Sequence, residues 1–288
     1  MERTTWTGRE LNDVLDRTSP VVRVVQLEQS ETVEQRPSNA PLELDEIEPY
    51  VREVLDGLDP ALIPERSARY RWSKRAFDLV VAVPGLVVAA PVIGALSLLI
   101  RWESPGPAIF RQQRVGLNGR VFTFYKFRTM YTDARERFPE LYDYSFDSSE
   151  LESRYYKQAQ DPRNTKLGVI IRQTTLDELP NLVNVIKGDA SIVGPRPELP
   201  EMIRHYRPSD LRKFRVKPGL TCLAASTGRN TLTIDEQIRA DVEYVTGQSF
   251  KLDLRIMLQT CLLYTSDAAD DLLCVDLGGR RIIKKKNN

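Results

Sequence analysis

The feature that most constrains this chain is an apolar segment at residues 79–100, in which 22 consecutive side chains lack an ionisable group. At about 1.5 Å per helical residue, such a segment reaches roughly 33 Å, which is just enough to cross a lipid bilayer. A helix buried in the core of a soluble domain is the alternative, but core helices are usually shorter than this. The sequence therefore predicts contact with a membrane.

Two properties of this segment argue against a straight transmembrane helix. Pro84 and Pro91 interrupt it, and a proline inside a helix removes a hydrogen bond and clashes with the preceding turn. Basic residues flank both ends, whereas a spanning helix usually carries the excess on one side only. We therefore expect residues 71–101 to form a re-entrant hairpin with its break at Pro91, in preference to a spanning helix. The flanking basic residues are Arg71, Lys74, Arg75, Arg101, Arg111, Arg114 and Arg120.

The polar N-terminal region, residues 1–70, contains six prolines. We expect a partly disordered extension with two short helices, at 11–17 and 44–57. Residues 1–37 carry acidic and basic side chains throughout, unlike a signal peptide, so the catalytic part is expected to face the cytoplasm. Residues 102–260 follow as the catalytic domain, with a strand expected at 121–125.

Composition excludes two further classes of protein. The net charge of +1 excludes a broadly basic nucleic-acid-binding surface, so we expect no nucleic-acid partner. Three cysteines without close spacing provide neither a disulfide framework nor a metal site.

The C-terminal residues 261–288 are best interpreted as foreign sequence. Residues 261–270 and 274–286 look like translated blocks of a sequencing-library adapter, and the final lysines would then come from a run of adenines. Read-through of this kind should be left out of an analysis of the fold. The alternative is a native basic tail that binds anionic lipid.

The candidate site is a pair of adjacent carboxylates, Asp177 and Glu178, between Arg172 and a Gly-Pro-Arg-Pro turn that carries Arg196. Arginine forks suit phosphate oxygens, and a divalent cation can bridge carboxylates and phosphates. This combination indicates chemistry on a phosphate ester.

Each of these residues also has a structural interpretation. Residues 175–178 fit a helix capping box, and residues 194–197 fit a rigid turn. Lys126 and Arg128 fit the solvated face of a strand. His205, the only histidine, is expected to be a surface residue rather than a catalytic one.

Taken together, the motifs of this chain resemble the bacterial sugar transferases, the monotopic polyprenol-phosphate phosphoglycosyl transferases, over about residues 72–260. The first block of matching residues comprises 74–78, 104–107, Phe110, Gln112, Arg114, Gly116, Gly119 and 125–130. The second comprises 161–163, 176–180, 187–189, 193–197, 217–221 and 228–230. Two departures are an alanine before Pro91, where the family often has serine, and small side chains at 221–227.

The resemblance implies a ping-pong enzyme. Asp177 would attack the sugar-bearing phosphorus of a UDP-sugar and release UMP, and undecaprenyl phosphate would then take the phosphosugar from the carboxylate. Glu178 would act as a base or metal helper, with Mg²⁺ held by Asp177 and Glu178. Arg172, Arg196, Arg229, Lys126 and Arg128 would surround the phosphates.

The resemblance also implies the architecture and location. We expect a single compact α+β domain, mostly helical, with the re-entrant membrane hairpin and interfacial amphipathic helices as anchors. The protein would lie on the cytoplasmic face of the bacterial inner membrane, in contact with membrane lipid, and a homodimer is left open. A membrane-anchored metal-dependent hydrolase of diphosphates and an inert membrane scaffold are the alternative functions.

Overall fold

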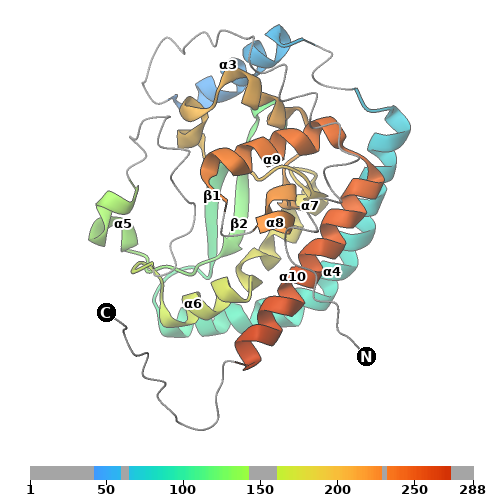
Figure 1. Cartoon of the computed structure of the whole chain (residues 1–288). Helices are drawn as coiled ribbons and strands as arrows, with labels where there is room; N and C mark the ends of the chain where they lie inside the picture. Colours follow the sequence, from blue (N-terminus) through green and yellow to red (C-terminus); the bar gives the residue numbers. More distant parts are fainter. Residues whose placement is uncertain (1–41, 60–64, 143–160, 229–231, 274–288) are drawn as a thin grey trace, which may run out of the picture. The chain divides into compact units, whose positions relative to one another are not determined.

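The computed structural model describes residues 42–59, 65–142, 161–228 and 232–273, which all lie within one compact unit, Ala40–Asn288. Helices surround two small sheets in the described part (Figure 1). Strands β1 (Ile109–Val115) and β2 (Val121–Phe127) form an antiparallel hairpin, and β3 (Ser191–Val193) pairs in parallel with β4 (Gly219–Thr221). The expected mostly helical α+β class is confirmed, and β2 covers the predicted strand.

Short helices lie between these strands and directly after β4. They are η2 (Leu117–Gly119), α5 (Ala134–Arg137), η3 (Pro139–Tyr142), α6 (Lys166–Gln173), η5 (Leu176–Asn181), α7 (Leu182–Lys187), η6 (Pro200–His205), η7 (Pro208–Arg215) and α8 (Leu223–Gly228). Two longer helices, α9 (Ile234–Gly247) and α10 (Phe250–Leu273), follow. Helix α10 continues past residue 260, while residues 274–288 lie outside the described part. The start of foreign sequence at residue 261 stays a prediction.

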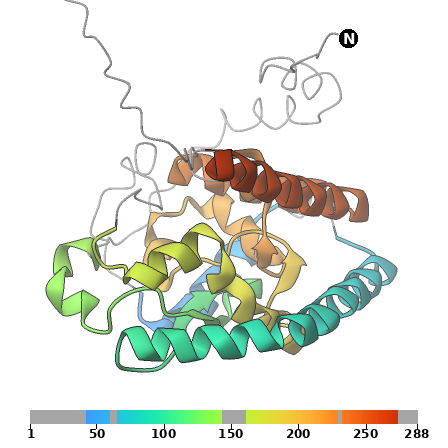
Figure 2. The ribbon, with the colours of Figure 1, turned by 90° about the horizontal axis from the view of Figure 1, so that it is seen from below.

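The apolar segment lies in the 36-residue helix α4 (Ala68–Glu103). Both Pro84 and Pro91 lie inside this continuous helix. Figures 1 and 2 show that α4 changes direction along its length, as prolines cause when one backbone hydrogen bond is lost. Among the described helices, α4 alone is long and apolar enough to cross a membrane. The re-entrant hairpin itself stays a prediction.

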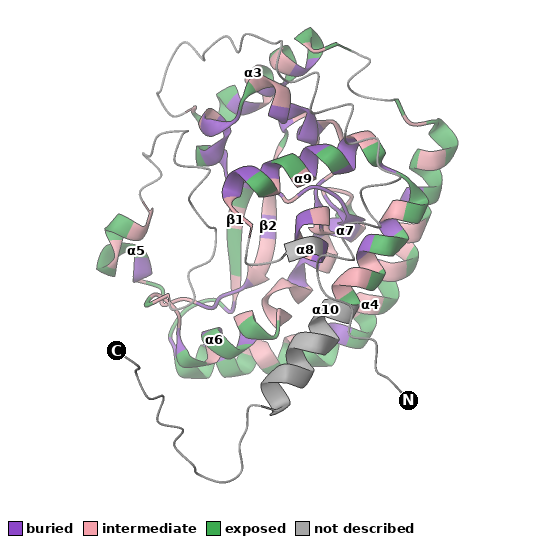
Figure 3. Cartoon of the chain, viewed as in Figure 1, coloured by how far each residue is buried: buried purple, intermediate pink, exposed green. Residues whose placement is uncertain are grey.

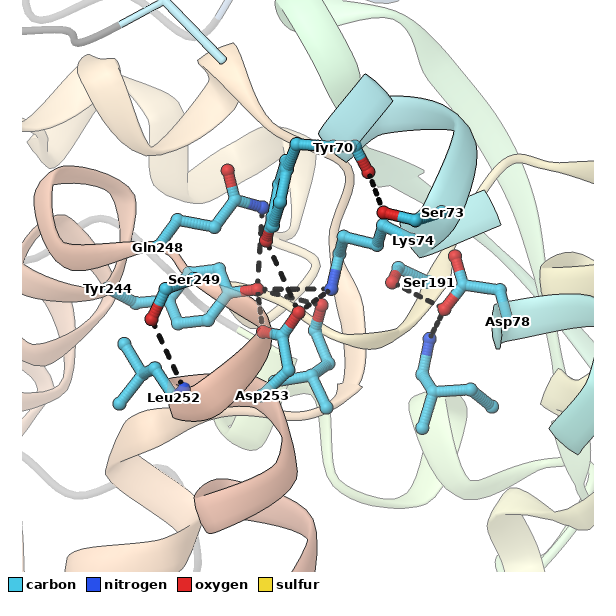
Figure 4. A network of polar contacts seen from close by, with 12 residues as sticks. Tyr70, Ser73, Lys74, Asp78, Ser191, Tyr244, Gln248, Ser249, Leu252 and Asp253 are labelled. Atoms are coloured by element: carbon cyan, nitrogen blue, oxygen red, sulfur yellow. Dashed lines mark hydrogen bonds and ion pairs between the residues drawn. The ribbon is translucent and has the colours of Figure 1, made fainter. Parts of the chain in front are cut away.

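One face of α4 fixes it to the rest of the structure. Lys74 and Asp78, one turn apart, are buried on this face (Figure 4). The Lys74 ammonium donates to Asp253 at 2.7 Å and to the hydroxyl of Tyr244 at 3.2 Å. The Asp78 carboxylate accepts hydrogen bonds from two residues at the start of β3. The hydroxyl of Ser191 donates at 2.8 Å, and the backbone N–H of Ile192 donates at 3.0 Å. The other face of α4 is largely exposed (Figure 3), although it is apolar.

The extension contributes a helix at the expected place, because α3 spans Leu44–Gly57. Its buried residues Ile47, Val51 and Leu55 join the same core cluster as Leu211 of η7. At Gly119 a Cβ atom would lie 2.7 Å from the Cβ of Val51, so this glycine permits the close approach of α3. The predicted helix at 11–17 lies outside the described residues.

Candidate functional site

Six of the seven predicted site residues line one cleft of about 1790 Å³. They come from four different parts of the chain: Asp177, Glu178, Arg172, Arg196, Lys126 and Arg128. The seventh, Arg229, lies outside the described residues. The fold therefore gathers side chains that are up to 70 positions apart in the sequence, from Lys126 to Arg196, around one space.

The two carboxylates lie on η5, a 3₁₀ helix that Thr175 precedes. Thr175 has φ 59° and ψ 14°, a left-handed conformation that β-branched residues rarely adopt. The capping-box interpretation is wrong, because the Thr175 side chain makes no hydrogen bond that caps η5. A 3₁₀ helix has about three residues per turn, so Asp177 and Glu178 project in different directions. This separation suits two different roles better than a shared proton.

Arg172 reaches the cleft from the last turn of α6. Its Nη1 atom donates to Asn164 at 3.0 Å and lies 3.6 Å from an Asp161 carboxylate oxygen. Partial burial opposes ionisation of Asp161, but hydrogen bonds from Arg163, at 2.8 and 2.7 Å, hold the pKa of its carboxyl below the usual value. Asp161 is therefore charged at neutral pH and orients Arg172.

Lys126 interacts electrostatically with several charged residues that line the cleft. Burial, followed by the positive charge of Arg114, lowers its pKa to about 8, whereas the nearby Asp177 opposes the shift. Arg172 and Arg196 lower the pKa further. Only charges close in space couple in this way, so Arg114, Arg172, Arg196 and Asp177 all lie near Lys126. Such a cluster of cations attracts an anionic ligand.

Arg196 lies in the Gly-Pro-Arg-Pro turn, which packs tightly. A Cβ atom on Gly194 would lie 2.4 Å from the carbonyl oxygen of Lys217. The backbone N–H of Arg196 donates to both carboxylate oxygens of Asp241, at 3.1 and 3.2 Å. The rigid-turn interpretation and the binding-site interpretation thus describe the same loop.

Three buried ionisable residues that the sequence did not reveal hold this turn in place. Lys213, Glu198 and Asp241 are buried together, and the Lys213 ammonium lies 2.7 Å from Asp241 and 3.5 Å from Glu198. Tyr206 accepts from Lys213 at 3.0 Å and donates to Glu198. Buried ionisable residues look like surface residues in a sequence, and only their positions in the fold reveal the network.

Two other residues differ from their sequence interpretation. Arg128 is buried, and it donates to backbone carbonyls of Ser104 at 2.7 Å and Ile100 at 3.4 Å, at the end of α4. This geometry favours a helix-capping role, and its phosphate-binding role stays a prediction. His205 is only 6% exposed and accepts a hydrogen bond from Arg204, so the expectation of a surface histidine is wrong.

The residues at the site fit a divalent cation that is shared with a substrate. Within the described residues, no group of three or more histidine, cysteine, aspartate or glutamate side chains could hold a metal alone. Mg²⁺ is commonly bound by one or two carboxylates together with substrate phosphates. Asp177 and Glu178 supply such carboxylates in the cleft that the cationic side chains also line.

Comparison with known proteins gives one family. The family model described as "Bacterial sugar transferase" matches residues 69–267. The chain is 41% identical over 196 residues to "Galactosyl transferase CpsE" of Streptococcus agalactiae serotype III (strain NEM316), covering 66% of this chain and 42% of that protein. It is 41% identical over 181 residues to "Putative undecaprenyl-phosphate N-acetylgalactosaminyl 1-phosphate transferase" of Bacillus subtilis (strain 168), covering 62% and 88%. It is 36% identical over 198 residues to "Undecaprenyl-phosphate galactose phosphotransferase" of Salmonella typhimurium, covering 69% and 41%.

Proposed function

Because the chain belongs to the bacterial sugar transferase family, we propose that it transfers a sugar 1-phosphate from a nucleotide sugar to undecaprenyl phosphate. The family membership confirms the resemblance seen in the sequence. The observation that carries the proposal is the cleft that Asp177 and Glu178 line together with the cationic side chains of Lys126, Arg172 and Arg196. Relatives named for transfer to undecaprenyl phosphate share this family, which favours the same acceptor.

The proposed reaction has two steps. A carboxylate oxygen of Asp177 attacks the phosphorus that bears the sugar, and the bond from this phosphorus to the UMP oxygen breaks, so that UMP leaves with the electron pair. The phosphate oxygen of undecaprenyl phosphate then attacks the same phosphorus and displaces the Asp177 carboxylate. A carboxylate is a feasible nucleophile for such a covalent step. Two steps let a soluble donor and a lipid acceptor use one site in turn.

The side chains around Asp177 hold charge in place during both steps. Arg172 and Arg196 are always protonated and offer planar donor pairs to phosphate oxygens, and Lys126 adds a third cation. Asp161 and the buried network under Arg196 keep these groups oriented before substrate arrives. Mg²⁺, held by Asp177 and Glu178, would add charge neutralisation for the diphosphate.

The membrane helix brings the acceptor to the cleft. Ser97 and Arg101, in the last part of α4, line the cleft together with the carboxylates. Trp72 and Trp102, near the two ends of α4, are 76% and 87% exposed, as expected for side chains at a membrane–water interface. We place the cleft on the cytoplasmic side, with α4 as a re-entrant anchor. Cysteines introduced at 71 and 101 should then both react with a cytoplasmic label, and periplasmic labelling of either would exclude the hairpin.

Incubation with radiolabelled UDP-sugar, undecaprenyl phosphate and Mg²⁺ tests the function. Label that moves to the lipid phase supports the transferase. Release of UMP with free sugar phosphate would instead indicate a hydrolase, and the absence of turnover would indicate a scaffold. A panel of UDP-hexoses and UDP-N-acetylhexosamines would identify the sugar.

A further inference from the structure

The helix α3 lies outside the family match, which begins at residue 69, yet it is part of the catalytic structure. Leu42, Glu43 and Leu44, at the start of α3, line the same cleft as Asp177. A segment that merely preceded the enzyme would not contribute to the wall of its active site. This wall is therefore a feature that the family match alone does not predict.

Several contacts hold the start of α3 in place. Ile47, Val51 and Leu55 are 0–1% exposed in the core. The guanidinium of Arg215 donates to the Leu55 carbonyl at 2.7 Å. A capping box fixes the first turn, because the Glu43 N–H donates to the Glu46 carboxylate at 3.0 Å while Glu43 caps α3. These contacts hold residues 42–44 in a fixed position beside the cleft.

The cleft lining includes elements at two opposite places. Ser97 and Arg101 line it from α4, and residues 42–44 line it from α3. Figure 1 shows β1 and β2 running between α3 at one end and the C-terminal half of α4 at the other. The lipid acceptor approaches from the membrane and therefore enters the cleft on the side of α4. The part of the cleft near α3 then remains for the soluble donor.

We propose that residues 42–44 form part of the donor subsite and contact the non-phosphate part of the nucleotide sugar. This inference rests on the proposed function and deepens it. Leu42 and Leu44 are apolar and suit the face of a nucleobase or a sugar ring, whereas the cations near Asp177 suit the diphosphate. The segment then influences which donor the enzyme accepts.

The test is the substitution Leu44→Ala in the full chain. Leu44 is 50% exposed and lines the cleft, so the fold should tolerate the change. We expect the KM for UDP-sugar to rise on the order of threefold to tenfold, as for the loss of one apolar contact, with the KM for undecaprenyl phosphate unchanged. Leu58→Ala is the matched control, because Leu58 follows the other end of α3, outside the cleft lining, and should leave both KM values unchanged.

The outcomes separate this inference from the function. If the wild type transfers label but Leu44→Ala leaves the donor KM unchanged, or alters both KM values equally, the donor subsite is refuted and the transferase stands. If the wild type makes no product, calorimetric binding of UDP-sugar to both proteins decides: weaker binding by Leu44→Ala supports the subsite, and equal binding overturns it. Weaker inhibition by UMP would assign the contact to the nucleoside, and unchanged inhibition beside a raised donor KM would assign it to the sugar.

Discussion

The ammonium group of Lys213 lies 2.7 Å from a carboxylate oxygen of Asp241, and each residue is only 2% exposed. Asp241 also accepts the backbone N–H of Arg196, so this buried ion pair supports the loop that brings Arg196 to the cleft. Burial alone would lower the pKa of Lys213, but Asp241 and Glu198 raise it above its usual value. The lysine is therefore charged, and it balances carboxylates that no solvent reaches.

Lys213→Met should destabilise the protein strongly. The substitution leaves Asp241 and Glu198 as buried carboxylates without their cation, which typically costs about 3–5 kcal/mol of unfolding free energy. Urea unfolding in detergent would measure the change. Lys166→Met, at an exposed position on α6, is the control and should change the unfolding free energy by less than about 0.5 kcal/mol. Equal stabilities for both variants would show that the buried pair contributes nothing.

The pH dependence of donor binding should report Lys126. Its pKa of about 8 means that the ammonium loses its proton as the pH rises through this value, and with it the attraction for phosphate. We expect the KM for UDP-sugar to rise above pH 8 in the wild type. In Lys126→Arg the charge persists, so the inflection near pH 8 should disappear. An inflection of equal size in both proteins would assign it to another group.

The effect of Lys126 on stability changes with pH in the opposite direction to its effect on donor binding. Its pKa in the folded protein, about 8, lies below the usual lysine pKa of 10.5 that applies to the unfolded chain. Between these values the unfolded state binds more protons, so this group makes unfolding less favourable as the pH rises from about 8 to 10.5. Comparing unfolding of the wild type with Lys126→Met across this range isolates the effect, which the variant should lack.

Asp161 should matter for catalysis through Arg172. Asp161→Asn removes the charge that orients this arginine, and we expect kcat/KM to fall on the order of tenfold, as for a modest misplacement of a binding group. Asp133→Asn is the matched control, because within the described residues Asp133 forms an ion pair with Arg137, an exposed arginine one turn away on α5. A loss of activity in both variants, or in neither, would contradict the positioning role.

The exposed face of α4 should control membrane association. Val88 is 76% exposed on this face, and a carboxylate there would face the apolar part of the membrane at a cost of several kcal/mol. Val88→Asp should therefore shift the protein from vesicles to the soluble fraction in a flotation assay. Gly57→Asp adds the same charge at an open position on α3 and should leave vesicle binding unchanged. Retained binding of Val88→Asp would exclude this face as the anchor.

Local patterns predicted a substantial part of the fold. The helix at 44–57 and the strand beginning at residue 121 follow from apolar periodicity and from turn residues on either side. The long apolar segment lies within α4, which is bent but continuous through Pro84 and Pro91, and the re-entrant hairpin stays a prediction. That α3 packs into the catalytic core was not predictable, because its partners, such as Leu211, lie more than 150 positions away.

The residues of the candidate site were predictable where a local motif indicated their chemistry. They were not predictable where packing between distant segments determines their position. Asp177, Arg172 and Arg196 were found from their spacing, and the fold places them in one cleft. The capping box was not found, because Thr175 has a left-handed backbone that its sequence does not indicate, and its side chain makes no capping hydrogen bond. The burial of Lys213 depends on charges from distant segments, which no local pattern encodes.

The most direct test concerns the carboxylate of Asp177. Wild-type protein incubated with UDP-sugar alone should release UMP and carry a phosphosugar on the Asp177 side chain, detectable by mass spectrometry of the peptides. Asp177→Asn should carry no adduct and transfer no sugar while still binding membranes. An active, donor-loaded wild type that never shows the adduct, or an Asp177→Asn variant that still transfers sugar, would contradict the account.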